Sequence, residues 1–435
     1  MTQTPTGAAR VRRRPGNLTE QTLLICALIG TTQMTWGTIV PALPLYVDHF
    51  GATALILGPI IAAFGLGRAI VNIPAGIALR WWKPRPFLYA VCGLLVIVTA
   101  LTGFAPDATT LIVARVIAGL LGGAAITIGF AVLVAGAPAD RRGRVMSTAT
   151  AVQMSAGALG AFLGGLVLTW FPIEIAFVVA PVPLVLCLVW DAIRPASLYW
   201  GTQMRRVASA SAGSARPRGL PLVVIALALA AFAAFVARFG GEQGLIPLLG
   251  YDQGGLTPFT LGLALAAATV VSLIAMPLVG IVLDRGVRLI VFVPGVLLAV
   301  VAMLLFPVVN GPWQYAGIIV LYGLATCVAG VVPSVVTSDA VSPQQSGFVV
   351  GLTRTAGDAG AVVGPLVVFA VYEACGGIGA ALVIAVVLVA LNAPLVGWLL
   401  RSRSSSRSLS SSRSLSSSKG SPSTTPTIPG PAINQ

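Results

Sequence analysis

The sequence predicts an all-α membrane protein whose twelve transmembrane helices form two six-helix bundles related by a pseudo-repeat. Of its 435 residues, 57% are hydrophobic and only 9% are charged, whereas about 25% of residues are charged in soluble globular proteins. Twelve apolar stretches reach or approach the roughly 20 residues that cross a bilayer as a helix. Short glycine motifs also recur at one constant offset between the two halves of the chain.

The apolar stretches divide six and six around a polar segment. They are 22–46, 54–79, 87–105, 110–134, 146–170, 174–190, 220–241, 258–283, 289–309, 315–337, 348–372 and 377–400. The first is longer than the apolar part of a signal peptide, and no small-residue cleavage site follows it, so we expect it to be retained as a helix.

The stretches also set the expected domain limits. These are an N-terminal segment (1–20), a first bundle (21–192), a central loop (193–219), a second bundle (220–400) and a tail (401–435). The tail repeats SRSLSSS and ends rich in Pro and Thr. Such a composition cannot bury a core, so we expect the tail to be disordered.

Basic residues indicate the orientation of the chain. They precede the first stretch and follow the second, fourth, sixth, eighth and twelfth stretches, while the predicted outer loops contain none. Because cytoplasmic loops are enriched in Lys and Arg, both termini are predicted to be cytoplasmic. The net charge of +14 then reflects this topology and contact with anionic membrane lipids. We expect no nucleic-acid partner, because no folded basic domain is present.

The residues needed for enzyme chemistry are scarce. His49 is the only histidine, so neither a histidine-based metal site nor a Ser-His-Asp triad is expected. No phosphate-cradling ATPase motif occurs. We therefore expect no enzyme activity, no catalytic residue, no cofactor and no metal. The cysteines lie in or beside apolar stretches without metal-ligand spacing, and we expect no disulfide among them: Cys26, Cys92, Cys187, Cys327 and Cys375.

The two halves of the chain repeat each other. GIALRWW in the first half matches GIVLDRG in the second, and two further glycine motifs match at the same offset of 204 residues. The matched pairs are Gly76 and Gly280, Gly143 and Gly347, and Gly160 and Gly364. The coincidence predicts an internal duplication. Two six-helix halves in parallel repeat form one transporter architecture, with the substrate site at their interface.

From residue 20 to 400 the chain resembles the major facilitator superfamily, and more narrowly its twelve-helix drug:proton antiporter-like branch. The family signature G-x-L-A-D-R-x-G-R, between helices two and three, recurs in the second half with one residue missing. The first-half copy has Arg80 at the acidic position. The resemblance implies a cytoplasmic gate at Gly76, Arg80, Gly280, Asp284 and Arg285. We expect Arg80 to pair with Asp140 or Asp339 when the inner side is closed.

Two more family patterns appear. RVIAGLLGGA, starting at Arg115, resembles the R-x-x-x-G motif that the family associates with proton transfer. GALGAFLGG resembles the antiporter pattern G-x-x-x-G-P-x-x-G-G, but Ala161 stands where proline is usual. The antiporter-like glycines and the second-half copy are Gly157, Gly160, Gly164, Gly165, Gly364 and Pro365. Close helix packing is a sufficient reason for these glycines.

Charges within apolar stretches are the main functional candidates, because a charge at mid-bilayer costs about 2.5–3.5 kcal/mol on insertion scales. Arg354 and Asp358 are four residues apart and can pair on one helix face. Two interpretations remain: a structural ion pair, or a carboxylate in the translocation path. Arg238 and Glu242 form a second such pair. The proton-coupling candidates are Asp358 first, then Glu242, with Arg354 and Arg115.

Several polar side chains are candidates for the substrate path. Arg68 and Asn72 share one helix face with Gly65, so Arg68 can face the bundle. The substrate-path candidates are Gln33, Trp36, Arg68, Asn72, Gln153 and Arg238. Within the apolar stretches basic residues outnumber acidic ones, which favours anionic or polar amphiphilic substrates.

The sequence therefore predicts a secondary active transporter that exports a small drug-like or metabolite molecule by alternating access, coupled to protons. One alternative is a proton symporter or facilitator for uptake. Another is a transport-inactive membrane sensor or a membrane enzyme. We expect a monomer in the plasma membrane, and the abundance of Ala, Gly and Arg suggests a bacterial source.

Overall fold

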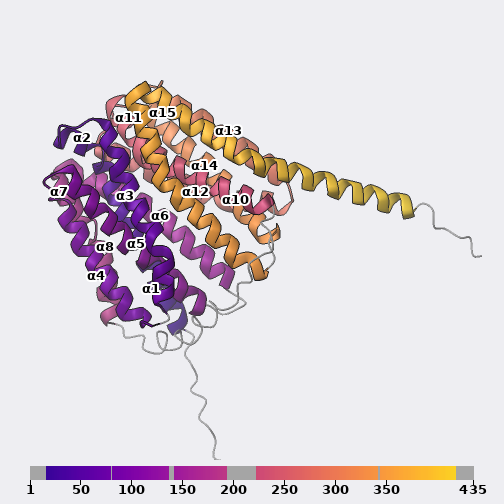
Figure 1. The fold of residues 1–435 in the computed structure, drawn as a ribbon, viewed down its shortest axis with the longest axis horizontal. Coiled ribbons are helices and arrows are strands. Elements are labelled where there is room, and N and C mark those ends of the chain that lie inside the picture. Colours follow the sequence, from indigo (N-terminus) through magenta and orange to yellow (C-terminus); the bar gives the residue numbers. More distant parts are fainter. Residues whose placement is uncertain (1–15, 80, 137–141, 194–221, 341–342, 418–435) are drawn as a thin grey trace, which may run out of the picture.

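The computed structural model describes residues 16–79, 81–136, 142–193, 222–340 and 343–417, and nearly all of them are helical (Figure 1). The first half comprises α1 (Gly16–Ile39), α2 (Leu45–His49), α3 (Leu57–Ala78), α4 (Pro84–Thr102), α5 (Ala108–Gly136), α6 (Arg142–Trp170), α7 (Ile173–Val179) and α8 (Val182–Ile193). The second half comprises α10 (Leu222–Val236), η3 (Ala237–Leu245), α11 (Ile246–Asp252), α12 (Pro258–Asp284), α13 (Arg288–Leu305), α14 (Pro312–Ala340) and α15 (Pro343–Ser417). Two short 3₁₀ turns, Val40–Ala42 and Ala54–Ile56, flank α2.

Eleven helical stretches of the described chain are long and apolar enough to cross a membrane. The last one, Val349–Arg401, has 53 residues and contains Gly376, whose φ of 72° and ψ of −172° are not helical. Glycine adopts a positive φ at little cost, so α15 is two helices that meet at Gly376. The structure thus confirms an all-α membrane fold and is consistent with the twelve predicted helices.

The structure differs from the predicted limits at two places. The seventh stretch was predicted to end at residue 241, but its helical run continues to Asp252. Several glycines near residue 241 are typical of a helix end. They lie instead in η3, a π-helix in which the backbone stays hydrogen-bonded. Helix α15 continues to Ser417, past the predicted start of the tail, and no Gly or Pro occurs between residues 401 and 417 to stop it. The central loop (194–221) and residues 418–435 lie outside the described residues.

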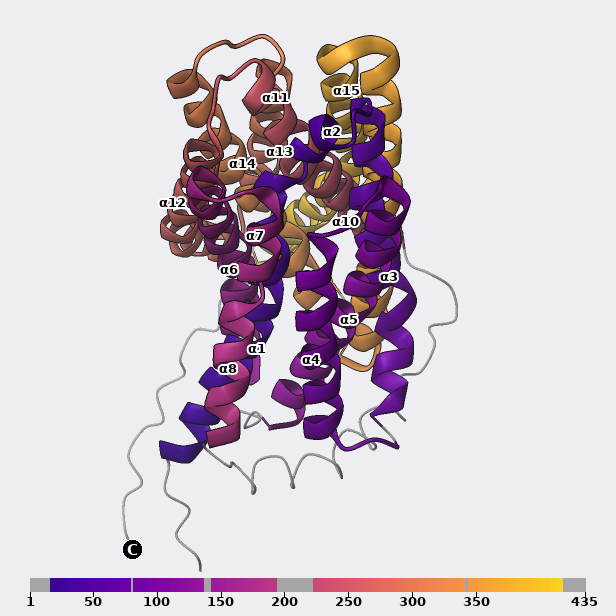
Figure 2. The ribbon, with the colours of Figure 1, turned by 90° about the vertical axis from the view of Figure 1, so that its left-hand side faces the viewer.

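Each half forms its own bundle, and the bundles meet along two helix pairs. Within the halves α1 packs on α6, α3 on α5, and α10 on α15. Between the halves α3 packs on α15, and α6 packs on α12. Figure 2 shows these two pairs on opposite sides of the molecule. Four helices, α3, α15, α6 and α12, therefore border the predicted substrate region between the repeats.

The two bundles touch at one end and diverge toward the other (Figure 1). At the end with α2 and α11, called the outer end here, the Tyr251 hydroxyl donates to the Pro41 carbonyl at 2.7 Å across the bundles. At the opposite, inner end, which the basic loops predict to be cytoplasmic, a Cβ on Gly76 or Gly280 would meet no heavy atom within 4 Å. Among the described residues, the bundles are therefore in contact at the outer end and lie apart at the inner end (Figure 1).

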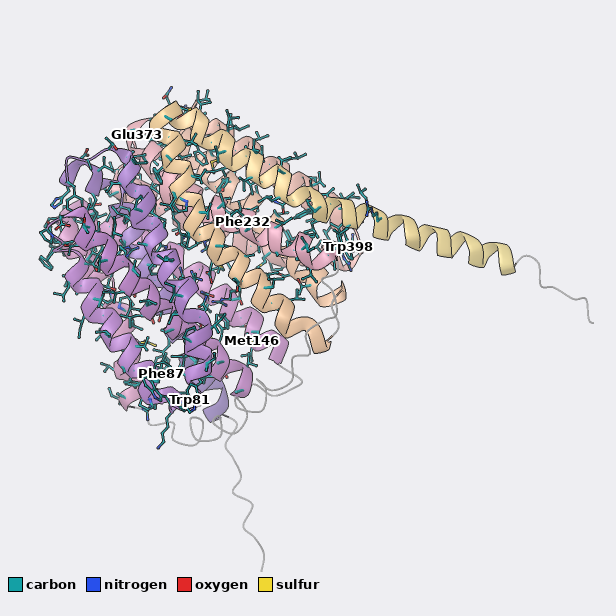
Figure 3. The ribbon with its side chains drawn as sticks, viewed as in Figure 1. Trp81, Phe87, Met146, Phe232, Glu373 and Trp398 are labelled. Carbon is teal, nitrogen blue, oxygen red and sulfur yellow. The ribbon has the colours of Figure 1, made fainter. Side chains whose placement is uncertain are left out.

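Large apolar side chains cover the outside of the bundles, as expected for a surface that faces lipid. Aromatic residues gather near the helix ends, including Trp313 and Trp81, which are 88% and 72% exposed. Figure 3 shows Trp81 and Phe87 at the inner end and Glu373 at the outer end. Aromatic rings at these levels are typical of the membrane–water interface.

Candidate functional site

A carboxylate joins the two bundles near the middle of the molecule. Asp358 on α15 is 2% exposed, and its Oδ2 accepts a 2.5 Å hydrogen bond from Nδ2 of Asn72 on α3. Its Oδ1 lies 3.5 Å from Nη2 of Arg68, also on α3. Thr127 on α5 donates to Oδ1 of Asn72 at 3.1 Å. This group, the Asp358 network, connects three helices from both bundles.

The ion pair expected within one helix is not the one that forms. In the described part of the chain the ion-pair partner of Asp358 is Arg68, and the guanidinium of Arg354 lies 5.9 Å from the centre of the Phe130 ring. A Cβ on Gly65 would be 3.0 Å from the Ala361 carbonyl oxygen, so α3 and α15 approach closely there. This approach brings Arg68 across the bundle interface to the carboxylate.

The second expected pair does not form either. Nη1 of Arg238 donates to Sδ of Met154 on α6 at 2.9 Å, and the described ion pairs do not include Arg238 with Glu242. Both residues lie in the π-helix η3. Residues four apart no longer stack in a helix that bonds from i to i+5, so the α-helical spacing argument fails there.

The π-helix supplies a contact that the sequence analysis missed. Gln243 Oε1 accepts a 2.8 Å hydrogen bond from Nε1 of Trp36 on α1, across the two bundles. Single π turns within α-helices often occur at functional sites. The only sequence signal was the three glycines on either side of Glu242, at the predicted end of the seventh stretch.

A buried cation lies in the first bundle beside these residues. Arg115 on α5 is 1% exposed, and its guanidinium lies 4.2 Å from the Trp36 ring centre and 5.2 Å from that of Phe64. The two rings stack on each other at 4.2 Å. Among the described residues, Nε and Nη2 of Arg115 have no hydrogen-bond partner. A cavity of about 10 Å³ adjoins the guanidinium and is also lined by threonines and Gln33.

The predicted path residues of α1 and α6 meet one another. Nε2 of Gln153 lies 3.4 Å from Oε1 of Gln33, at the limit of a hydrogen bond. Both side chains are 6% exposed. Gln33 also lines one cavity with Trp36 and Arg115.

The predicted glycine motif packs helices, as its physical interpretation required. A Cβ on Gly160 or Gly164 would overlap the backbone of α1, whereas one on Gly157 would meet only the Gln33 side chain at 3.9 Å. Gly165 instead faces the Pro258 backbone of α12, across the bundles. In the second half a Cβ on Gly364 would be 2.8 Å from Cα of Val236 on α10, and the carbonyl oxygen of Pro365 faces Gly58 of α3.

The predicted cytoplasmic gate is described only in part. Gly76 and Gly280 stand at the inner end, and Arg285 is exposed. Arg80, Asp140 and the side chains of Asp284 and Asp339 lie outside the described residues. The expected pairing of Arg80 therefore stays a prediction.

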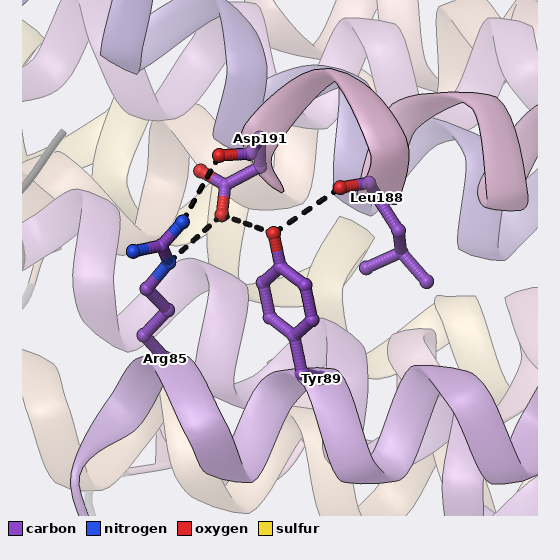
Figure 4. A network of polar contacts seen from close by, with 4 residues as sticks. All are labelled: Arg85, Tyr89, Leu188 and Asp191. Carbon is purple, nitrogen blue, oxygen red and sulfur yellow. Dashed lines mark hydrogen bonds and ion pairs between the residues drawn. The ribbon is translucent and has the colours of Figure 1, made fainter. Parts of the chain in front are cut away.

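A second polar network, at the inner end of the first bundle, was not foreseen (Figure 4). Nε of Arg85 lies 3.0 Å from Oδ2 of Asp191, and the Tyr89 hydroxyl donates to the same oxygen at 2.5 Å. Asp191 is fully buried. The network ties α4 to α8 and so holds the inner ends of these helices together.

The match to a family model decides the identity of the fold. The model of the Major Facilitator Superfamily matches residues 25–365 and 227–429. The chain belongs to the major facilitator superfamily. It is a multi-pass membrane transporter of the cell membrane and not an enzyme, as the sequence predicts.

Relatives and solved structures agree with this assignment. Multidrug resistance protein MdtG of Serratia proteamaculans is 26% identical over 393 residues, which cover 87% of this chain and 92% of that protein. An uncharacterized transporter of the superfamily from Methanocaldococcus jannaschii, MJ1560, is 25% identical over 37% of this chain, and the match spans 42% of that protein.

The solved structures share the fold at low sequence identity. A POT family transporter in complex with 5-aminolevulinic acid has a TM-score of 0.71 at 12% identity, covering 88% of this chain and 96% of that one. A bacterial homolog of the lysosomal transporter Spinster, inward-facing and occupied, has a TM-score of 0.68 at 15% identity, covering 88% and 97%. Transporters of this kind carry small molecules.

Proposed function

We propose that the chain exports a small molecule against its gradient by alternating access, and that Asp358 couples this movement to protons. The observation that carries the proposal is the position of Asp358, a buried carboxylate whose two partners come from the other bundle. A buried acid that bridges two moving bodies can convert a change of protonation into a change of their contact. The names of the MdtG relatives support export as the direction.

The two oxygens of Asp358 have different roles in this mechanism. Oδ2 holds the hydrogen bond from Asn72, whereas Oδ1 has no hydrogen-bond partner among the described residues and lies at ion-pair distance from Arg68. A proton on Oδ1 displaces no hydrogen bond but removes the negative charge that Arg68 faces. Hydrogen bonds to charged groups contribute about 1.5–3 kcal/mol, enough to shift the balance between two bundle arrangements by roughly ten- to a hundredfold.

The substrate passes between the bundles in this proposal. On its way it meets Gln33, Gln153 and Trp36, which lie on α1 and α6 of the first bundle. Movement of the bundles breaks the Trp36–Gln243 bond, because its two ends belong to different bundles. Gln33, Gln153 and Trp36 are thus exposed to one side of the membrane at a time.

The test is proton flux in liposomes that contain a pH-sensitive dye. Ethidium, a cationic amphiphile, and benzoate, an aromatic carboxylate, are added to wild type, Asp358→Asn and Glu373→Gln. Glu373 is an exposed acid at the outer end of the same helix, so its removal controls for the loss of one charge. We expect substrate-driven proton movement in wild type and Glu373→Gln, and none in Asp358→Asn.

Other outcomes contradict specific parts of the proposal. Equal proton flux in all three proteins would show that Asp358 is not the coupling residue, and Glu242 would be the next candidate. Substrate movement without proton flux in any of them would indicate a facilitator. Proton and substrate entering together would indicate a symporter for uptake.

A further inference from the structure

The cation Arg115 forms no ion pair with any residue that the structure describes. Its side chain is buried at 1% exposure, yet the ion pairs of the described residues involve Arg68 and Arg85 rather than Arg115. A buried charge normally requires an opposite charge and hydrogen bonds to remain ionised. The helix beside it, α1, has no acidic residue between Glu20 and Asp48. No described residue therefore supplies an anion at this position.

The aromatic rings beside Arg115 only partly compensate for the missing anion. Trp36 and Phe64 lie 4.2 and 5.2 Å from the guanidinium carbon. Such contacts attract a cation through the face of the ring, but they accept no hydrogen bond from the edge of the guanidinium. Nε and Nη2 lie on that edge and have no hydrogen-bond partner among the described residues. Two donors thus remain available for an oxygen or halide ligand.

The space beside these donors is small, and both polar and apolar side chains line it. The polar residues that line this cavity of about 10 Å³ are Arg115, Gln33 and three threonines, Thr32, Thr35 and Thr99. A volume of this size accepts roughly one water-sized group. It can accept one oxygen of a charged head group, while the rest of the molecule lies beside it, toward the contact between Gln33 and Gln153.

We infer that Arg115 binds the carboxylate of an organic anion, whose apolar part lies against Trp36 and Phe64. This inference rests on the proposed transport function and names the chemical class of its substrate. The planar guanidinium pairs well with a carboxylate, because two of its N–H groups match the two oxygens. Arg115 would then hold the substrate in the first bundle, while the Asp358 network responds to protons at the interface.

The test is direct binding to the purified protein without any gradient. Titration calorimetry compares benzoate, its neutral isostere benzamide, and chloride. The variants are Arg115→Gln, which removes the charge, and Gln33→Glu, which places a carboxylate in the same cavity and leaves Arg115 intact. Lys83→Gln removes one exposed charge at the start of α4 and is the control.

We expect saturable binding of benzoate to wild type and to Lys83→Gln, and no binding of benzamide. Both cavity variants should weaken benzoate binding by about tenfold or more, since each removes a charge-assisted contact. Gln33→Glu should also raise the melting temperature, which separates a filled site from a misfolded protein. Binding is measured without a gradient and needs no proton movement, so this inference can fail or hold independently of proton coupling.

Three results would overturn the inference: no benzoate binding to wild type, equal binding of benzoate and benzamide, or unchanged binding in Arg115→Gln and Gln33→Glu. Binding of chloride but not benzoate, lost in Arg115→Gln, would overturn the carboxylate assignment and give the site to an inorganic anion.

Discussion

In the proposed alternating-access cycle, adding one methyl group at Gly165 should shift the balance between the two open states. Gly165 lies on α6 and faces the backbone of Pro258 on α12, and a Cβ there would lie 3.0 Å from the Pro258 carbonyl carbon and closer still to its oxygen. Backbone atoms cannot move aside as a flexible side chain can. The Gly165→Ala variant therefore forces the two bundles apart at the outer end.

The size of the effect follows from overpacking. Extra methylene groups in a packed interior cost about 1–3 kcal/mol. That cost falls on the arrangement that is closed at the outer end, because the contact between α6 and α12 exists only while the bundles meet there. At about 1.4 kcal/mol per tenfold change, the equilibrium should move roughly 5- to 150-fold toward the outward-open state.

Labelling of a buried reporter cysteine measures this shift. Leu248 on α11 is 6% exposed and belongs to the apolar cluster formed mainly by the first bundle. With Cys327 and Cys375 replaced by alanine, Leu248→Cys should react with an impermeant maleimide faster in Gly165→Ala. The variant Gly262→Ala should also speed the labelling of Leu248→Cys, because its Cβ would lie 2.6 Å from the Ala161 carbonyl oxygen of α6.

A neighbouring glycine provides the control. Gly164 faces the backbone of Thr38 within the first bundle, so Gly164→Ala should lower the melting temperature without increasing the labelling of Leu248→Cys. Unchanged labelling in a folded Gly165→Ala protein would refute the idea that this crossing holds the outer end closed.

Three further predictions concern stability. Gly160→Ala should lose about 1–3 kcal/mol because it meets the backbone of α1, whereas Gly157→Ala should be tolerated; thermal unfolding in detergent compares them. Tyr89→Phe should lose about 1–2 kcal/mol in the same assay, because Asp191 is fully buried and loses a hydroxyl donor. Asp107→Ala should melt below wild type at neutral pH, because the Asp107 carboxylate accepts the amide hydrogen three residues on, at 2.8 Å, which lowers its pKa. That stabilisation is present above the ordinary carboxyl pKa and is lost as the pH falls through the lowered pKa, so the two melting curves should converge in acid.

The sequence predicts the helices well, because in a membrane each helix is specified by its own residues rather than by its neighbours. Each helix must satisfy its own backbone hydrogen bonds and present about 20 apolar residues, so length and hydropathy are sufficient to find it. The glycine motifs were predictable for a similar reason. Gly160 and Gly164 lie four residues apart on one face, and small residues at that spacing allow a neighbouring helix to approach.

The partners of the buried charges were not predictable, because they depend on which helices become neighbours. Spacing along one helix paired Asp358 with Arg354, but the close approach of α3 at Gly65 places Arg68 and Asn72 nearer. Spacing also paired Arg238 with Glu242, and the π-helix altered the turn that the argument assumed. Gln243 gave no signal of its own, since its partner Trp36 lies in the other half of the chain.

Two kinds of contact between the bundles differ in whether they can respond to protons. At the outer end Gly165 and Pro258 meet backbone to backbone, and the Tyr251 hydroxyl donates to a carbonyl. None of these groups changes its charge in the physiological range. Nearer the centre, a carboxylate on one bundle faces a guanidinium and an amide on the other. These outer contacts can therefore set how strongly the closed arrangement is favoured, whereas in the proposed mechanism a proton acts on that balance through Asp358. This division explains why the two perturbations should differ: Gly165→Ala should change which state is populated at every pH, while Asp358→Asn should remove the dependence of that population on pH.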